Sequence, residues 1–191
     1  YTSYENQNFG PEYNGQMVIL GGKLVDGSYQ MVPYTGMDNK RDFFETGVSM
    51  QNDISISGAD EKSNFYLSAQ DVRTTGTILD DTNSRSSVRM AAGKKYGKFS
   101  ADYTLSFSQT STSVSGGDMN QNRPVYWNVL NTPAHVAIRS YKDIENNPFA
   151  TVDGYFNAYY PNPYWQIKHS RLNEKRNDIL GSVLLAFKPY E

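Results

Sequence analysis

The chain has 191 residues, with 18 Lys and Arg against 20 Asp and Glu, so its formal net charge is −2. This balance excludes a basic nucleic-acid-binding protein, and the absence of cysteine excludes a disulfide scaffold and a thiolate metal site. Two histidines make a multi-histidine metal site unexpected, and a mean hydropathy of −0.65 excludes a bundle of membrane-spanning helices. No metal, cofactor or nucleic-acid partner is therefore predicted.

Five segments alternate between apolar and polar residues, which is typical of strands with one apolar face. The clearest is 99–109, where Phe99 and Leu105 belong to a series of apolar residues that alternates with polar ones. In chain order the segments are 48–58, 64–74, 87–93, 99–109 and the more uniformly apolar 178–188. No stretch shows a helical stripe longer than two turns, and 125–138, which contains Pro133, is predicted to be irregular.

The connections between these segments differ greatly in length. Residues 58–63 and 94–98 are short turns, 76–84 is longer, 110–176 is very long, and 1–47 precede the first strand. In an antiparallel meander alternate connections lie at opposite ends, so we expect the short turns at one end and the long connections at the other. Outer-membrane barrels have this asymmetry, whereas a soluble β-sandwich has no general reason for it.

Aromatic residues also gather at the short-turn end of the expected sheet. An aromatic belt at a membrane–water boundary would produce this pattern, and the alternative is that aromatic residues are simply common in strands. The expected strands, roughly ten residues long, match the ~9–11 residues of a tilted membrane-spanning strand. The aromatic residues concerned are Phe65, Tyr66, Tyr96, Phe99, Phe187 and Tyr190.

Two blocks of the sequence carry motifs whose order and spacing are informative. The first block comprises 42–47 (DFFETG), 52–58 (NDISISG) and 63–68 (SNFYLS), and the second comprises 162–165 (NPYW), 173–176 (NEKR), 179–183 (ILGSV) and 187–189 (FKP). In this order and spacing the blocks resemble the SusC/RagA family of TonB-dependent outer-membrane transporters, the first block being similar to the early barrel. The resemblance runs from about Tyr4 to Pro189, and 129–133 (VLNTP), between the blocks, fits it loosely.

The resemblance implies an all-β fold, namely a partial antiparallel up-and-down transmembrane β-barrel with about five strands of a larger barrel and a long extracellular loop. Residues 1–47 would be the first extracellular loop leading into a strand, 48–109 four strands with short periplasmic turns, 110–176 the long extracellular loop, and 177–188 a further strand. Because five strands cannot close a barrel, and no plug or TonB-contacting segment is visible, we expect a fragment of a longer transporter.

Acidic pairs and histidines give little indication of catalysis. The pairs at 60–61 and 80–81 fall in expected turns, where acidic residues are ordinary. His135 and His169 lie near serines but lack the order and the nucleophile turn of a Ser-His-Asp enzyme. We therefore predict no catalytic residue and no enzyme. The arginines of the strands are expected to point into a polar lumen: Arg73, Arg85 and Arg89.

The most suggestive cluster lies in the long loop 110–176, where aromatic residues are interleaved with asparagines. Flat rings and amide groups suit sugar rings and peptide backbones, so these rings are candidates for contact with a ligand or a lid protein. Two alternatives stay open: the rings form a small core within the loop, or they form a protein interface. The candidate contact residues are Phe149, Tyr155, Tyr159, Tyr160, Tyr164 and Trp165.

The resemblance implies a transport protein of the bacterial outer membrane, a TonB-dependent importer of oligosaccharides or oligopeptides that acts with a SusD-like surface lipoprotein. This chain would supply wall and rim in contact with outer-membrane lipid, and the TonB system would act through parts outside it. The alternative is a secreted all-β adhesin or carbohydrate-binding module whose aromatic loop holds the ligand. A glycoside hydrolase is disfavoured because no acid/base pair emerges.

Overall fold

The computed structural model of the protein describes residues 10–118, 121–152, 154–157 and 159–190, and antiparallel β-strands dominate it. The first nine residues of the predicted segment 1–47, Tyr4 among them, lie outside the described residues. The chain forms two compact units. Unit 1 comprises Tyr1–Thr46, Gly76–Asp81 and Val114–Leu172, and unit 2 comprises Gly47–Thr75, Thr82–Ser113 and Asn173–Glu191.

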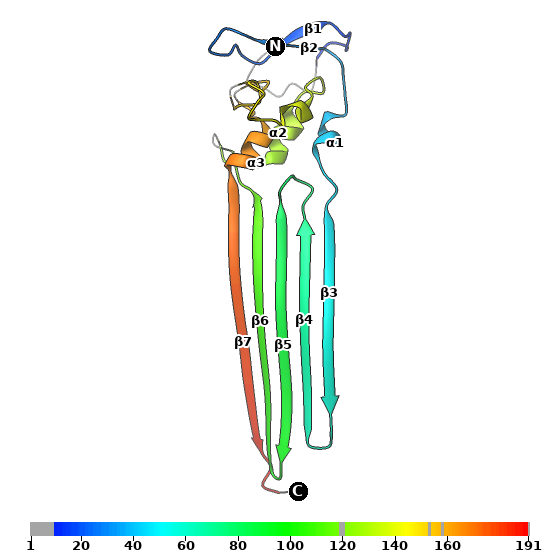
Figure 1. Ribbon diagram of the computed structural model, residues 1–191, viewed down its shortest axis with the longest axis vertical. Coiled ribbons are helices and arrows are strands. Elements are labelled where there is room, and N and C mark those ends of the chain that lie inside the picture. The colour runs from blue at the N-terminus through cyan, green and yellow to red at the C-terminus, as the bar shows by residue number, and fades with distance from the viewer. Residues whose placement is uncertain (1–9, 119–120, 153, 158, 191) are drawn as a thin grey trace. The chain divides into compact units, whose positions relative to one another are not determined.

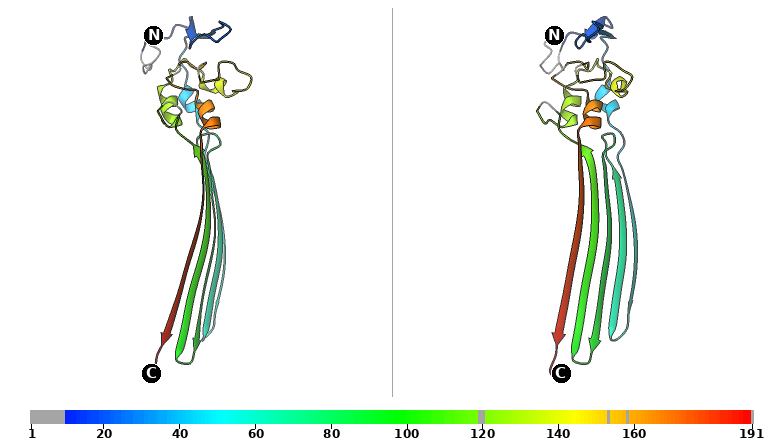
Figure 2. Two further views of the ribbon diagram at one scale, coloured as in Figure 1. Left: turned by 90° about the vertical axis from the view of Figure 1, so that its left-hand side faces the viewer. Right: turned by 60° about the vertical axis from the view of Figure 1, so that its left-hand side comes forward.

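Unit 2 is an antiparallel sheet of five strands, each paired with its neighbours in sequence, in the order β3-β4-β5-β6-β7 (Figure 1). The strands are β3 (Val48–Ala59), β4 (Ser63–Thr75), β5 (Thr82–Tyr96), β6 (Phe99–Ser115) and β7 (Arg171–Phe187). All five segments that alternate in the sequence are strands, which confirms the predominantly β fold. Viewed edge on, the sheet is a single curved layer (Figure 2). Strands β3 and β7 are its edges, so the described residues form an open sheet.

Three strands are longer than the alternation predicts. Strand β5 begins at Thr82 rather than at residue 87, β6 ends at Ser115 rather than at 109, and β7 begins at Arg171 rather than at 178. The added residues are mostly polar on both faces, so they show no alternation, although their backbone groups still pair across the sheet. The connection predicted as 110–176 is shortened accordingly, to 116–170.

The short turns lie at one end of the sheet and the longer connections at the other, as the sequence predicts. Between β3 and β4, Asp60 Oδ1 accepts the backbone N–H of Lys62 at 2.7 Å and of Ser63 at 2.6 Å, which closes a tight turn. Between β5 and β6, Gly97 has a φ of +58°, a conformation that glycine adopts at little cost.

Unit 1 contains all the buried apolar side chains among the described residues. They form two clusters, one around Tyr155 and Phe156 and the other around Val129 and Ile138. The elements of unit 1 are β1 (Met17–Leu20), β2 (Gln30–Pro33), α1 (Asn39–Phe43), α2 (Val125–Asn131), the 3₁₀ turn η1 (Ile138–Tyr141) and α3 (Pro163–His169). Several of the buried residues, Tyr155 and Phe156 among them, lie in the loops between these elements. Strands β1 and β2 pair with each other in an antiparallel hairpin.

Segment 125–138, predicted to be irregular, contains helix α2, so that prediction is wrong. Pro124 is the N-cap of the helix and Pro133 follows its C-cap Thr132, so the prolines bound the helix instead of interrupting it. Helices α2 and α3 have seven residues each, too few to show a helical stripe in the sequence. Within the part of the chain that the structure describes, no helix has the length and apolar character needed to cross a bilayer.

Candidate functional site

The sheet of unit 2 separates apolar from polar side chains. Cross-strand partners share a face, so the strand pairing assigns each residue to one side. Two successive rows of partners on one side are Ile54, Ala69, Val88 and Phe107, then Ile56, Leu67, Met90 and Leu105. The row between them, on the other side, is Ser55, Ser68, Arg89 and Ser106. We call the first side the apolar face and the second the polar face.

Strand β7 continues the apolar face. The rings of Phe99 and Phe187 stack with their centroids 4.6 Å apart, and a Cβ atom on Gly181 would lie 3.7 Å from the side chain of Leu105. These contacts put the odd-numbered residues of β7, from Ile179 to Phe187, on the apolar face.

The side chains of the apolar face are largely exposed. Met90 is 40% exposed and Ile179 is 74% exposed, and no buried apolar residue of the described chain belongs to this sheet. Contiguous exposed apolar surface of this kind marks a site of contact with a membrane or with another protein. The apolar face is therefore the first candidate functional surface.

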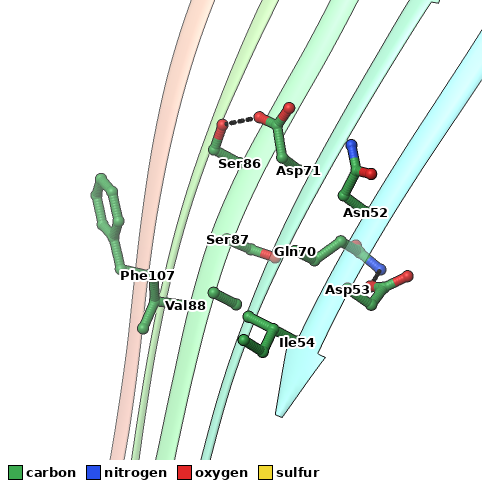
Figure 3. Close-up of a pocket in the computed structure, with 10 residues that line it drawn as sticks. Asn52, Asp53, Ile54, Gln70, Asp71, Ser86, Ser87, Val88 and Phe107 are labelled. Atoms are coloured by element: carbon green, nitrogen blue, oxygen red, sulfur yellow. Dashed lines mark hydrogen bonds between the residues drawn. The ribbon is translucent and has the colours of Figure 1, made fainter.

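The apolar face ends at a row of polar residues. Figure 3 shows Asp71 and Ser86 in the row next to Ile54 and Val88, and Ser86 Oγ donates to Asp71 at 2.7 Å. A shallow groove of about 360 Å³ lies along this boundary. Towards the longer connections, the next residues on this side of β6 are Gln109, Ser111 and Ser113, so the apolar face covers only part of the length of the strands.

Polar side chains cover most of the polar face on β3 to β6, and some of them are hydrogen-bonded to one another. Gln51 and Gln70 both donate to the carboxylate of Asp53, at 2.6 and 2.7 Å, and Figure 3 shows Gln70 beside Asp53. On β7, however, Leu180 and Leu184 lie on this side and are exposed. The face is thus polar on β3 to β6 and mixed on β7.

The arginines of the strands do not share one face, contrary to the prediction of a common lumen position. Arg85 and Arg89 lie on the polar face, but Arg73 is the partner of Met50 on the other side. There Arg73 Nε forms an ion pair with Asp71 at 3.0 Å. The spacing along separate strands could not reveal this, because the face of each residue depends on the register between strands.

The aromatic candidates of the loop are mostly buried in unit 1. Tyr155, Tyr160 and Tyr164 are at most 6% exposed and belong to the two apolar clusters, while Phe149 packs against one cluster and is partly buried. Burial raises the pKa of the Tyr155 phenol, whose oxygen lies 3.0 Å from the Thr132 hydroxyl. These placements favour the alternative in which the rings form the core of the loop.

Tyr159 and Trp165 are the aromatic candidates that neither belong to the two apolar clusters nor pack against them as Phe149 does. Tyr159 is 38% exposed and Trp165 is partly buried, with its ring stacked on His169 at 3.9 Å between centroids. The indole Nε1 of Trp165 is buried and has no hydrogen-bond partner among the described residues. A ligand role for the aromatic candidates stays a prediction, and these two are the members that a ligand could reach without opening the core.

The asparagines among these rings stabilise the backbone of the loop. Asn162 Nδ2 donates to the carbonyls of Tyr141 and Ala150, at 3.0 and 2.6 Å, and its Oδ1 caps α3 by accepting the N–H of Tyr164. Asn157 Oδ1 accepts the backbone N–H groups of the next turn in the same manner. Both polar atoms of the Asn162 amide and the Oδ1 of Asn157 are therefore occupied by the backbone and do not offer themselves to a sugar.

A buried ion pair, which the sequence analysis missed, lies under Tyr159. Arg123 Nε contacts Asp118 Oδ2 at 2.9 Å, and the guanidinium lies over the Tyr159 ring, 4.5 Å from its centroid. Burial alone would raise the pKa of Asp118, but the backbone N–H groups of Gln121 and Arg123 and the guanidinium outweigh it, so that pKa lies below its ordinary value. The pair is five residues apart in a polar loop, which gives no signal in the sequence.

The other titratable candidates have structural roles. Asp81 forms an ion pair with Arg171 at 2.9 Å and accepts the N–H of Ser115, and Asp60 closes the β3–β4 turn. Burial lowers the pKa of His135, whose ring packs against Tyr34. No group of three or more potential metal ligands occurs among the described residues.

Comparison with known proteins adds no relative: no protein-family model matches the chain, and no curated protein matches it either. The fold, the apolar face and the loop rings of Tyr159 and Trp165 therefore define an antiparallel β protein whose sheet exposes one apolar face.

Proposed function

We propose that the chain forms part of the wall and rim of an outer-membrane TonB-dependent importer of oligosaccharides or oligopeptides, acting with a SusD-like surface lipoprotein. The apolar face would contact outer-membrane lipid and the polar face an aqueous lumen. The observation that carries the proposal is the single-layered sheet with an exposed apolar face and a largely polar opposite face.

The dimensions of the apolar face support this proposal. Along β6 it runs from Phe99 to Phe107, a length close to the ~9–11 residues of a tilted membrane-spanning strand. Aromatic residues, among them Tyr96, Phe99 and Phe187, lie at the end with the short turns, where an interfacial aromatic belt would lie. The open edges β3 and β7 fit a wall that continues into further strands, because unpaired edges are not tolerated in hydrocarbon.

The rival function, a secreted adhesin or carbohydrate-binding module, has less support. In a soluble sandwich the apolar face would pack against a second sheet, and the described residues contain no second layer on unit 2. The exposed Tyr159 and the partly buried Trp165 would suit a binding loop in either protein.

Fractionation of the producing cells tests the proposed function. We expect the full-length protein in the outer-membrane fraction, soluble only in detergent, and migrating differently on gels when unheated, as closed barrels do. Recovery from the aqueous fraction without detergent, with one migration behaviour, would contradict the proposal and favour the secreted module.

A substitution at Tyr159 tests whether the loop binds a ligand or lid. Tyr159→Ala should weaken binding of the lid lipoprotein or of an oligosaccharide by about tenfold or more if the ring is a contact, since exposed aromatic anchors dominate such interfaces. Binding would be measured by calorimetry on the detergent-purified protein. The matched control is Tyr66→Ala, another exposed tyrosine that lies in the sheet. Unchanged affinity in the Tyr159 variant, together with a less stable loop, would assign the ring to packing.

A further inference from the structure

Two shallow grooves cross the apolar face at the end with the short turns, and one lysine lines both. The first groove, of about 500 Å³, is walled by Phe65 and Tyr103, and the second, of about 490 Å³, by Tyr96 and Phe99. Lys94 lies between them. It occupies the apolar face because its cross-strand partners there are Ser63 and Ala101.

Small residues beside large rings create these grooves. Gly58, Ala92 and Ala101 form the floor where neighbouring strands carry aromatic side chains. At Gly58 a Cβ atom would lie 2.6 Å from Cε1 of Phe65, so the ring occupies the space that any other residue would fill. The alternation of small and aromatic residues in the sequence of the strands therefore produces the grooves.

Lys94 forms no salt bridge among the described residues, but Asp60 lines the first groove with it, and the Lys94 charge adds to the hydrogen bonds from Lys62 and Ser63 that lower the pKa of that carboxyl. The nearby Asp60 has both carboxylate oxygens engaged in its own turn, where Oδ1 accepts the N–H groups of Lys62 and Ser63 and Oδ2 accepts the Ser63 hydroxyl at 2.9 Å. A lysine on an apolar surface extends its ammonium group towards the nearest polar boundary, which here is the row of short turns. The ammonium group is thus available to an anion at that boundary.

We propose, on the basis of the proposed membrane orientation, that this place holds an anionic glycerophospholipid, with its phosphate on Lys94 and its acyl chains along the two grooves. The surface combines a cation, the phenol groups of Tyr96 and Tyr103, and apolar walls. An amphiphile with an anionic head matches all three, whereas free phosphate leaves the walls uncovered and a neutral lipid makes no use of the lysine charge.

Native mass spectrometry of the full-length protein in detergent tests this site. Short-chain phosphatidylglycerol would be titrated against phosphatidylcholine of the same chain length. We expect tighter binding of phosphatidylglycerol, and about fivefold weaker binding after Lys94→Gln, the factor that one lysine near a membrane surface supplies. Inorganic phosphate at equal concentration should not displace the lipid.

Lys95→Gln is the matched control, because Lys95 is the next residue and pairs with Ser100 on the polar face. It should bind phosphatidylglycerol as the parent does. Equal affinity of the parent and Lys94→Gln, no preference for phosphatidylglycerol, or displacement by phosphate alone would each overturn the inference. A protein that fractionates with membranes but gives one of these results would retain the proposed function and lose only the lipid site.

Discussion

Leu105→Arg should destabilise the protein by about 2 kcal/mol in lipid vesicles, because arginine on the lipid side of a barrel costs about 2–4 kcal/mol at mid-bilayer and less near the interfaces. Leu105 lies on β6, which is paired on both sides, and belongs to the row of the apolar face next to that of Ile54 and Val88. Unfolding by denaturant in vesicles would measure the loss. In water the same change at a 46% exposed residue would be nearly neutral.

The adjacent residue supplies the control. Thr104 lies on the polar face in a row with Ala91, Tyr66 and Ser57. None of these residues is charged, so no charge in the row would alter the stability of an arginine variant. Thr104→Arg should change the stability by less than about 0.5 kcal/mol, as surface substitutions do. Equal stability of the two variants would contradict the assignment of the faces to lipid and lumen.

Arg123→Met should destabilise unit 1 by about 3–5 kcal/mol, because it leaves the Asp118 carboxylate buried without its cation. The side chain of Asp118 is fully buried and that of Arg123 is 10% exposed, so water cannot replace the lost partner. The substitution also removes the hydrogen bond that Arg123 Nη2 donates to the Tyr159 carbonyl at 2.5 Å. Hydrogen exchange of peptides covering 116–170 would measure it as faster exchange confined to this loop.

The double variant Asp118→Asn with Arg123→Met should recover part of this stability, since no uncompensated charge remains. The acid response gives a second control. The pKa of Asp118 is lower in the folded state than in the unfolded chain. The ionised carboxylate therefore contributes its full stability above a pH of about 3.9, the unfolded pKa, and this stability is lost as the pH falls through the lower folded pKa. Asp118→Asn should abolish this acid-dependent loss, and a loop that exchanges alike in all variants would rule out a stabilising pair.

The sheet was predictable because its apolar face imposes a period of two on the sequence. Ile54, Ile56, Phe65 and Leu67 alternate with polar residues, so the strands and their order could be inferred. The extensions of the strands could not, since residues such as those at 110–115 are polar on both sides while the backbone ladder continues. Face assignments across strands, such as that of Arg73, required the register that only the structure supplies.

The loop was harder to predict because short elements carry weak patterns. Helix α3 begins at an Asn162 cap followed by Pro163, a local signal that could have located it. The burial of Tyr155 and Tyr160 depends instead on contacts from distant segments, such as Leu20 of β1 in the same cluster. Aromatic residues interleaved with asparagine are compatible with both a binding surface and a core, so composition alone could not decide between them.

Contact between the apolar face and lipid can be measured directly, because this chain has no cysteine of its own. Leu105→Cys and Thr104→Cys would each be labelled with an environment-sensitive fluorophore in the full-length protein, with any cysteine outside this chain replaced, and reconstituted in vesicles. We predict that lipids with brominated acyl chains quench the label at 105 strongly and the label at 104 weakly, while aqueous iodide does the reverse. Quenching of both labels by iodide alone would contradict a membrane-facing wall.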